Sequence, residues 1–193
     1  MTVTSQSTSR FRVMRLPISG VYALERRRIC DHRGFLTRLF CADELTAVGW
    51  RWPIVQVNHG YTKSIGTVRG LHYQIPPYSE AKLVSCIRGS VWDVAVDLRA
   101  GSPTFLRWYA QELSADNGTA LLIPPGCAHG FQALTDNTEL LYLHSGLHIP
   151  SADSGLNPRD PRLNIPWPLS VNTISDKDSN CQMIDSDFRG LEL

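Results

Sequence analysis

Glycine and proline divide this chain into short segments. Fourteen glycines and twelve prolines are spread through the 193 residues, so apolar segments are soon followed by a turn signal. The segment Ser90–Leu98 alternates apolar and polar side chains, with Asp93 and Asp97 on the face opposite Trp92, which is typical of a β-strand. Further short apolar segments, each predicted as a strand, are Lys82–Ile87, Ala120–Ile123 and Glu139–Leu143. This pattern favours an all-β sandwich or jelly roll.

The rest of the chain shows little helical pattern. Residues Ala42 to Val48 are predicted to form a helix of about two turns that ends at Gly49. The Pro-, Asn- and Asp-rich segment 150–168 is predicted to be an irregular arm over the sheet, anchored by Ile165 and Trp167. The length suits a single domain over residues 1–193, with residues 1–10 expected to be flexible.

Charge and cysteine content exclude several classes of protein. Nineteen basic and eighteen acidic residues give a net charge of +1, which argues against a general nucleic-acid or membrane-surface binder. Neither a membrane-spanning apolar run nor a signal peptide is recognised, so the cytoplasm is the expected location. Five cysteines without a CxxC pair predict neither a disulfide framework nor a zinc site, and no role is assigned to them.

Two of the six histidines lie in distinctive strings. His72 ends a G-x5-H string that begins at Gly66, and His129 ends the G-x5-P-x-G-x2-H string that begins at Gly118. In this order the strings resemble the two motifs of the cupins, which are small jelly-roll barrels. Where metal-binding cupins have a second His and a Glu, this chain has Gln74 and Tyr78 or Ser79. Two imidazoles are too few for a tight site, so no metal is expected.

Several polar residues near the first string suit proton transfer. A neutral imidazole at His72 can remove a proton next to a carbonyl, and a carboxylate such as Asp178 can orient it. An ammonium at Lys82 can stabilise the resulting enolate, and a phenol at Tyr142 can return a proton. The sequence does not show that these groups converge, because each also has an ordinary structural interpretation as a core or surface residue.

The motifs closely resemble those of the dTDP-4-dehydrorhamnose 3,5-epimerase family, in register from about Leu16 to Asp178. The matching segments are Val68-Arg-Gly-Leu-His-Tyr-Gln74, Ala81-Lys-Leu-Val84, Asp93-Val-Ala-Val-Asp-Leu-Arg99, Ser102-Pro-Thr-Phe105, Leu113-Ser-Ala-Asp116, Pro125-Gly-Cys-Ala-His-Gly-Phe131, Asp160-Pro161 and Pro166-Trp-Pro168. The resemblance implies a metal-independent cupin, in most members a homodimer, that epimerises a nucleotide-linked 4-keto-6-deoxyhexose at C3 and C5 without a cofactor.

The resemblance also implies roles for individual residues. His72 matches the general base, Asp178 its partner, Tyr142 the general acid and Lys82 the residue beside the enolate oxygen. The positions that match substrate contacts are Gln56, Asn58, Arg69, His129 and Lys177. Arg33 matches a basic residue that reaches the nucleotide in the partner subunit, and an Arg fork suits a diphosphate. We therefore expect Arg33, Arg69, Lys82 and Lys177 to form a basic pocket, balanced elsewhere by Asp93, Asp97 and Asp116.

This chain departs from the family pattern at positions near the substrate. Leu36 replaces an aromatic and Arg38 replaces a Glu at positions that contact the nucleotide base. His148 replaces a Tyr that borders the sugar, and Asp153 replaces a Glu. These differences leave open which nucleotide base the substrate carries and whether C3, C5 or both are epimerised. His144 and the run Arg26–Arg28 are interpreted as solvated surface.

Three alternatives remain at this stage. The first is a monoepimerase that acts at C3 or C5 alone, in a pathway to an unusual sugar or an antibiotic. The second is a metal-dependent cupin such as a dioxygenase, against which Gln74 argues. The third is a cupin that binds a sugar without catalysis.

Overall fold

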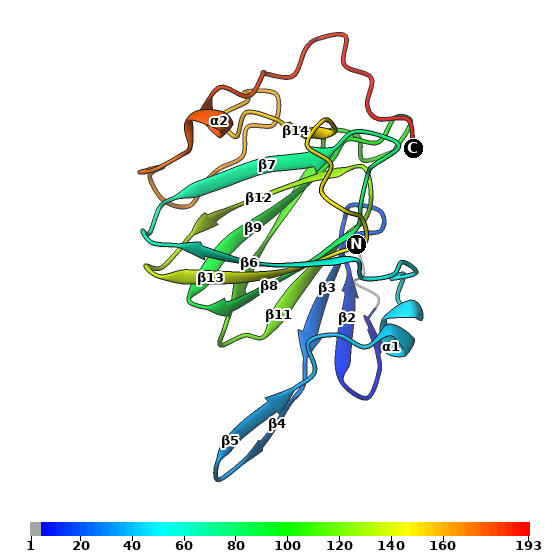
Figure 1. The fold of residues 1–193 in the computed structure, drawn as a ribbon, viewed down its shortest axis with the longest axis vertical. Coiled ribbons are helices and arrows are strands. Elements are labelled where there is room, and N and C mark those ends of the chain that lie inside the picture. Colours follow the sequence, from blue (N-terminus) through cyan, green and yellow to red (C-terminus); the bar gives the residue numbers. More distant parts are fainter. Residues whose placement is uncertain (1–4) are drawn as a thin grey trace.

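The computed structural model describes residues 5–193 and is built from two antiparallel β-sheets that face each other (Figure 1). The larger sheet has the strand order β1-β2-β3-β11-β8-β13-β6, and the smaller has the order β10-β9-β12-β7-β14. The strands of the larger sheet are β1 (Ser5–Ser7), β2 (Phe11–Arg15), β3 (Tyr22–Arg26), β6 (Gln56–Thr62), β8 (Lys82–Arg88), β11 (Thr119–Ile123) and β13 (Thr138–His144). Those of the smaller sheet are β7 (Val68–Gln74), β9 (Ser90–Asp97), β10 (Trp108–Ser114), β12 (Cys127–Ala133) and β14 (Asp153–Gly155). The predicted all-β jelly roll is therefore confirmed.

Apolar side chains fill the space between the sheets and cover both outer faces. The inner cluster joins Val84, Leu121 and Leu140 of the larger sheet to Ala95 and Phe131 of the smaller one. A second cluster, which includes Leu45 and Trp50, covers the outer face of the larger sheet. On the smaller sheet, the chain after β14 covers the outer face that carries Val94, Val96 and Leu98. This face of β9 is the one that the alternation in the sequence predicts.

The irregular arm lies where the sequence predicts it. Over residues 150–168 the chain forms turns and bends around the short strand β14. Ile165 is buried in the cluster that covers the smaller sheet, and Trp167 packs against that cluster. The Trp167 indole N–H also donates to the Pro158 carbonyl.

Two short helices complete the described chain. Helix α1 (Ala42–Thr46) ends before the predicted Val48, because the N–H of Trp50 turns back to the Leu45 carbonyl. Helix α2 (Asp176–Ser179) is N-capped by Ser175. Within residues 5–193, no helix is long and apolar enough to cross a membrane.

The hairpin of β4 (Arg28–Asp31) and β5 (Gly34–Thr37) projects away from the barrel (Figure 1). Its apolar side chains Ile29, Phe35 and Leu36 are exposed. The sequence predicts that the N-terminal segment 1–10 is flexible. Within it, Ser5–Ser7 form a strand that pairs with β2, and residues 1–4 lie outside the described residues.

Candidate active site

Side-chain alternation places a polar patch at one end of the barrel interior. On β13, Leu140 lies in the inner apolar cluster, so Tyr142 and His144 point to the same side of the sheet. On β8 the inward residues end at Lys82, which pairs in register with His144. Gln56 of β6 pairs with His144 on its other side. On β8 and β13 the inward side chains therefore change from apolar to polar at the same end, where β6 adds Gln56.

Two adjoining cavities open on this patch, with volumes of about 220 and 250 Å³. Both are lined by Asn58, His72, Lys82 and His144. The first also has Arg69, His129 and Tyr142 in its wall. The second is completed by Gln56, Tyr73, Gln74, Glu80, His148, Asp153 and Lys177. The structure thus brings together most of the residues that the sequence singles out.

His72 and Asp178 form a hydrogen-bonded pair across a large separation in sequence. The Nε2 of His72 lies 2.8 Å from Oδ1 of Asp178, 106 positions along the chain. The Ser175 hydroxyl caps α2 and accepts the N–H of Asp178, which fixes the start of the helix. The other carboxylate oxygen accepts the N–H of Gly70 at 3.0 Å. With Nε2 donating to Asp178, Nδ1 of His72 keeps a free lone pair and can act as a base.

The electrostatics of this pair favour a charged carboxylate. Burial alone would raise the pKa of Asp178, but hydrogen bonds from His72 and the Gly70 backbone hold it below its usual range. The His72 side chain is 36% exposed, so the imidazole remains accessible from the cavity. An ionised carboxylate behind an accessible imidazole stabilises the imidazolium that forms when His72 accepts a proton.

Two glycines allow β7 and β12 to approach closely beside this pair. A Cβ on Gly70, which has a φ of +113°, would lie 2.5 Å from the Cα of Gly130. A Cβ on Gly130 would lie 2.7 Å from the Arg69 carbonyl. This approach accompanies a register shift in β12, where His129 pairs directly with His72. Any larger residue at either position would separate the two histidines.

His129 forms a second imidazole–carboxylate pair with Asp93 of β9. Their Nε2 and Oδ1 atoms are 2.7 Å apart, and both side chains are buried. Burial raises the pKa of Asp93, and the bond from His129 partly offsets this. The His129 ring meets the Tyr142 ring edge to face, with centroids 5.9 Å apart. Burial also raises the pKa of Tyr142, so its phenol stays protonated at neutral pH and can donate a proton.

Lys82 is a buried cation in the same wall. Its Nζ lies 3.6 Å from Oε1 of Glu80 and donates to the His72 carbonyl at 3.4 Å. Burial lowers the pKa of Lys82, whereas the Glu80 carboxylate raises it. A buried ammonium beside the base can stabilise negative charge that develops on a substrate oxygen.

Of the remaining predicted residues, some lie at the cavities and others lie outside them. Lys177 pairs with Asp153 at the rim of the second cavity, and Arg69 donates to the Tyr61 carbonyl at 3.0 Å. Arg33 and Arg38 line neither cavity. Arg33 pairs with Asp31 in the projecting hairpin, and Arg38 pairs with Glu44.

Three sequence interpretations are wrong. His144 is buried in the cavity wall rather than solvated, because it follows Tyr142 at strand spacing. Arg26 is also buried, since it lies on the same face of β3 as Leu24, under the cluster that covers the outer face of the larger sheet, and donates to the Ser85 hydroxyl. Asp93 does not balance the pocket from elsewhere, because it lies inside the barrel and bonds to His129.

Sequence reasoning also missed Glu80 as a site residue. Its position two residues before Lys82 was the available signal, because a carboxylate close in sequence to a lysine expected in the pocket is a natural counter-ion. Over residues 5–193 no group of three or more His, Cys, Asp or Glu side chains could hold a metal ion.

The arrangement suits proton transfer at a carbon next to a carbonyl. One cavity contains an accessible imidazole with a carboxylate partner, a buried ammonium and a protonated phenol. These groups can remove a proton, stabilise an enolate and return a proton, respectively.

Comparison with known proteins points to the same chemistry. The family model of dTDP-4-dehydrorhamnose 3,5-epimerase matches residues 15–186. The dTDP-4-dehydrorhamnose 3,5-epimerase of Shigella flexneri is 40% identical over 178 residues, which cover 91% of this chain and 98% of the relative. A dTDP-4-dehydro-6-deoxyglucose 3-epimerase of Streptomyces bikiniensis is 38% identical over 167 residues, covering 86% and 85%.

A solved structure shows the same fold. The crystal structure of dTDP-4-dehydrorhamnose 3,5-epimerase from Bacillus anthracis, with TDP and PPi bound, superposes with a TM-score of 0.88. It is 38% identical, and the match covers 90% of this chain and 99% of that one. The chain therefore belongs to the dTDP-4-dehydrorhamnose 3,5-epimerase family of nucleotide-sugar epimerases.

Proposed function

We propose that this chain epimerises a dTDP-linked 4-keto-6-deoxyhexose at both C3 and C5, converting dTDP-4-dehydro-6-deoxyglucose to dTDP-4-dehydrorhamnose. The observation that carries the proposal is the His72–Asp178 pair, which opens on a cavity that also contains Lys82 and Tyr142. A family relative that holds TDP supports the nucleotide.

The C4 ketone acidifies the protons on C3 and C5. His72 removes one of them through Nδ1, and the Asp178 carboxylate stabilises the imidazolium. The electron pair of the broken C–H bond moves into the enolate, whose oxygen is stabilised by the Lys82 ammonium. Tyr142 returns a proton to the other face of the carbon. Exchange with water through the cavity opening resets both groups, and a second round inverts the other carbon.

A solvent-deuterium experiment tests the proposal. Incubation of dTDP-4-dehydro-6-deoxyglucose with the protein in D2O is expected to place deuterium at C3 and at C5, as read by NMR. Parallel reactions with the UDP, CDP and GDP sugars test which nucleotide base the protein prefers, because Leu36 and Arg38 differ from the family pattern. Failure to label any carbon in any of these sugars would contradict an epimerase activity.

A single epimerisation at C3 is the second candidate. The 3-epimerase of Streptomyces bikiniensis is nearly as similar to this chain as the 3,5-epimerase of Shigella flexneri. His148, at the rim of the second cavity, replaces the tyrosine expected beside the sugar. Deuterium at C3 alone would establish this alternative.

We also infer a homodimer in which the projecting hairpin reaches the partner's site. The Arg33 side chain is 78% exposed near the hairpin turn, and the neighbouring Phe35 and Leu36 are exposed apolar groups. A dimeric mass by light scattering and weaker dTDP binding by Arg33→Ala are expected. A monomeric mass with unchanged binding would contradict this inference.

A further inference from the structure

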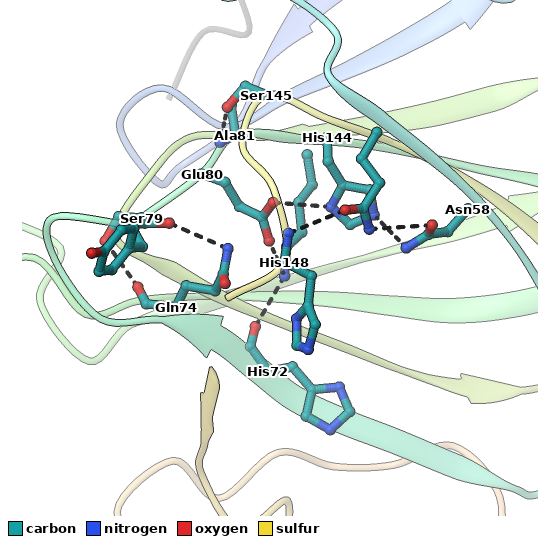
Figure 2. Close-up of polar contacts among 12 residues, drawn as sticks. Asn58, His72, Gln74, Ser79, Glu80, Ala81, His144, Ser145 and His148 are labelled. Atoms are coloured by element: carbon teal, nitrogen blue, oxygen red, sulfur yellow. Dashed lines mark hydrogen bonds and ion pairs between the residues drawn. The ribbon is translucent and has the colours of Figure 1, made fainter. Parts of the chain in front are cut away.

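A third imidazole–carboxylate pair, formed by His144 and Glu80, lies beside Lys82. Nδ1 of His144 is 3.1 Å from Oε2 of Glu80, and the other oxygen of Glu80 faces the Lys82 ammonium (Figure 2). The side chains of Glu80, Lys82 and His144 are 7%, 10% and 11% exposed. The mechanism proposed above uses Lys82 but assigns nothing to the other two residues.

A chain of hydrogen bonds fixes the protonation of His144. The backbone N–H of His148 donates to Oε1 of Gln56 at 3.1 Å, which leaves the Gln56 amide nitrogen to donate to Oδ1 of Asn58 at 3.2 Å. The Asn58 amide nitrogen therefore faces Nε2 of His144, at 3.3 Å, as a donor. Nε2 must accept, so the proton of a neutral His144 ring lies on Nδ1 and points at Glu80.

Glu80 is consequently a carboxylate that accepts from two sides. His144 donates to Oε2, and Lys82 is paired with Oε1. Its backbone is also fixed, because the N–H of the adjacent Ala81 donates to the Ser145 hydroxyl at 2.7 Å, just after β13 (Figure 2). Both the orientation and the location of the carboxylate are thus set by the end of β13.

We propose that Glu80 and His144 form a positioning pair that holds the Lys82 ammonium at the enolate site and keeps it charged. The proposal rests on the proposed epimerase function, since Lys82 has a role there. Without the carboxylate, a buried lysine loses its counter-ion, and its ammonium is free to move or to lose its proton. Without the His144 donor, one carboxylate oxygen loses its partner, and Glu80 can rotate away from Lys82.

Glu80→Gln tests whether the negative charge of the Glu80 carboxylate is needed beside Lys82. We expect kcat to fall about tenfold to a hundredfold, because a misplaced catalytic group is costly even when it is present. Affinity for dTDP should stay unchanged, since neither residue is assigned to the nucleotide. Glu139→Gln is the matched control, because it makes the same change on a carboxylate of β13 that is more exposed (24%) and lies away from Lys82. A wild-type kcat for Glu80→Gln would overturn the proposal.

The pH profile separates this role from a merely structural one. The Glu80 carboxylate raises the pKa of Lys82, so its removal should move the alkaline decline of kcat to lower pH. The other titratable groups that line the two cavities with Lys82 include Asp153, His72, His129, Tyr142, His144, His148 and Lys177, and all remain in this variant. An alkaline limb at the wild-type position would contradict the proposed effect on Lys82.

Two replacements of His144 test its contribution. His144→Asn keeps an N–H near the position of Nδ1 and should retain most of kcat, whereas His144→Leu should lower kcat about as much as Glu80→Gln. Equal loss in both variants would mean that filling the space, rather than the hydrogen bond to Glu80, is what matters.

A measurement on the resting protein keeps this proposal separate from the proposed function. The 15N shifts of the His144 ring, assigned with His144→Asn, should show the Nδ1–H tautomer at neutral pH. They should change in Glu80→Gln and not in Glu139→Gln. An Nε2–H tautomer would overturn the proposal even if the protein is an active epimerase. Conversely, a wild-type protein that labels no sugar would refute the epimerase function, whatever the tautomer.

Discussion

Two imidazole–carboxylate pairs lie side by side in this barrel and differ mainly in access. His72 and His129 are directly paired across β7 and β12, and their bonds to Asp178 and Asp93 are 2.8 and 2.7 Å long. The His72 side chain is 36% exposed, whereas that of His129 is 6% exposed. Geometry alone would make either imidazole a base, so exposure and carboxylate charge distinguish them.

The two carboxylates also differ in their pKa values. That of Asp178 is held below its usual range, whereas that of Asp93 is raised by burial. Within residues 5–193, one oxygen of Asp93 has no hydrogen-bond partner, while each oxygen of Asp178 has one. These differences support the proposal that the first pair holds a new positive charge, and that the second orders the barrel wall.

The two pairs are expected to differ most in kcat, when the carboxylate of each pair is replaced by an uncharged amide. Asp178→Asn should lower kcat about a hundredfold to a thousandfold, because the imidazolium loses its counter-ion. Asp93→Asn should lower it less than about tenfold, because the variant keeps a hydrogen-bonding group beside a histidine that is not the base. Steady-state kinetics with the dTDP sugar measures both. Equal losses would remove the distinction between the pairs.

For the free energy of unfolding the expected order is reversed, and loss of the Asp93 carboxylate should cost more than loss of the Asp178 carboxylate. Asp93→Ala should cost about 3 kcal/mol in the free energy of unfolding, because it leaves the buried His129 without its partner. Asp178→Ala should cost about 1–2 kcal/mol, since the exposed His72 ring can bind water instead. Urea unfolding measures both values. A larger loss for Asp178→Ala would show that this pair is the one that orders the wall.

Tyr142→Phe addresses the phenol that packs against His129. The variant keeps the ring contact at 5.9 Å but loses the proton donor. We expect dTDP binding to persist while kcat falls about tenfold to a hundredfold, or the ratio of epimers changes. Product analysis by NMR reads both quantities. Wild-type turnover with a wild-type product ratio would rule out Tyr142 as the acid.

The smallest effect concerns Asp97, on the same strand as Asp93. Burial would raise its pKa, but bonds from Arg99, Ser102 and Thr104 lower it to about 2. An acid with a lowered pKa in the folded state stabilises the fold above its unfolded pKa of about 3.9. The stability difference between wild type and Asp97→Asn should therefore be full at pH 7 and shrink from about pH 4 towards pH 2. Urea unfolding at pH 7, 4 and 3 checks this, and a difference that does not change with pH would contradict it.

Local patterns in the sequence predict the strands better than they predict the site. The alternation in Ser90–Leu98 predicts β9 and the apolar face that carries Val94 and Val96, because strand period is a local property. His72 and Asp178 are 106 positions apart, so the resemblance to a family, rather than spacing, suggested their pairing. Glu80 and His144 are 64 positions apart, and their contact depends on the register of β8 and β13. The Tyr142–His144 spacing did carry the signal that His144 faces inward.

The most direct test of the central claim compares His72→Asn with His129→Asn. Deuterium incorporation into dTDP-4-dehydro-6-deoxyglucose in D2O, with each variant in excess over the sugar, isolates proton removal from turnover. If His72 is the base, His72→Asn should bind dTDP and add no label beyond the enzyme-free reaction, while His129→Asn should still label the sugar at a reduced rate. Labelling by His72→Asn at the wild-type rate would contradict the account.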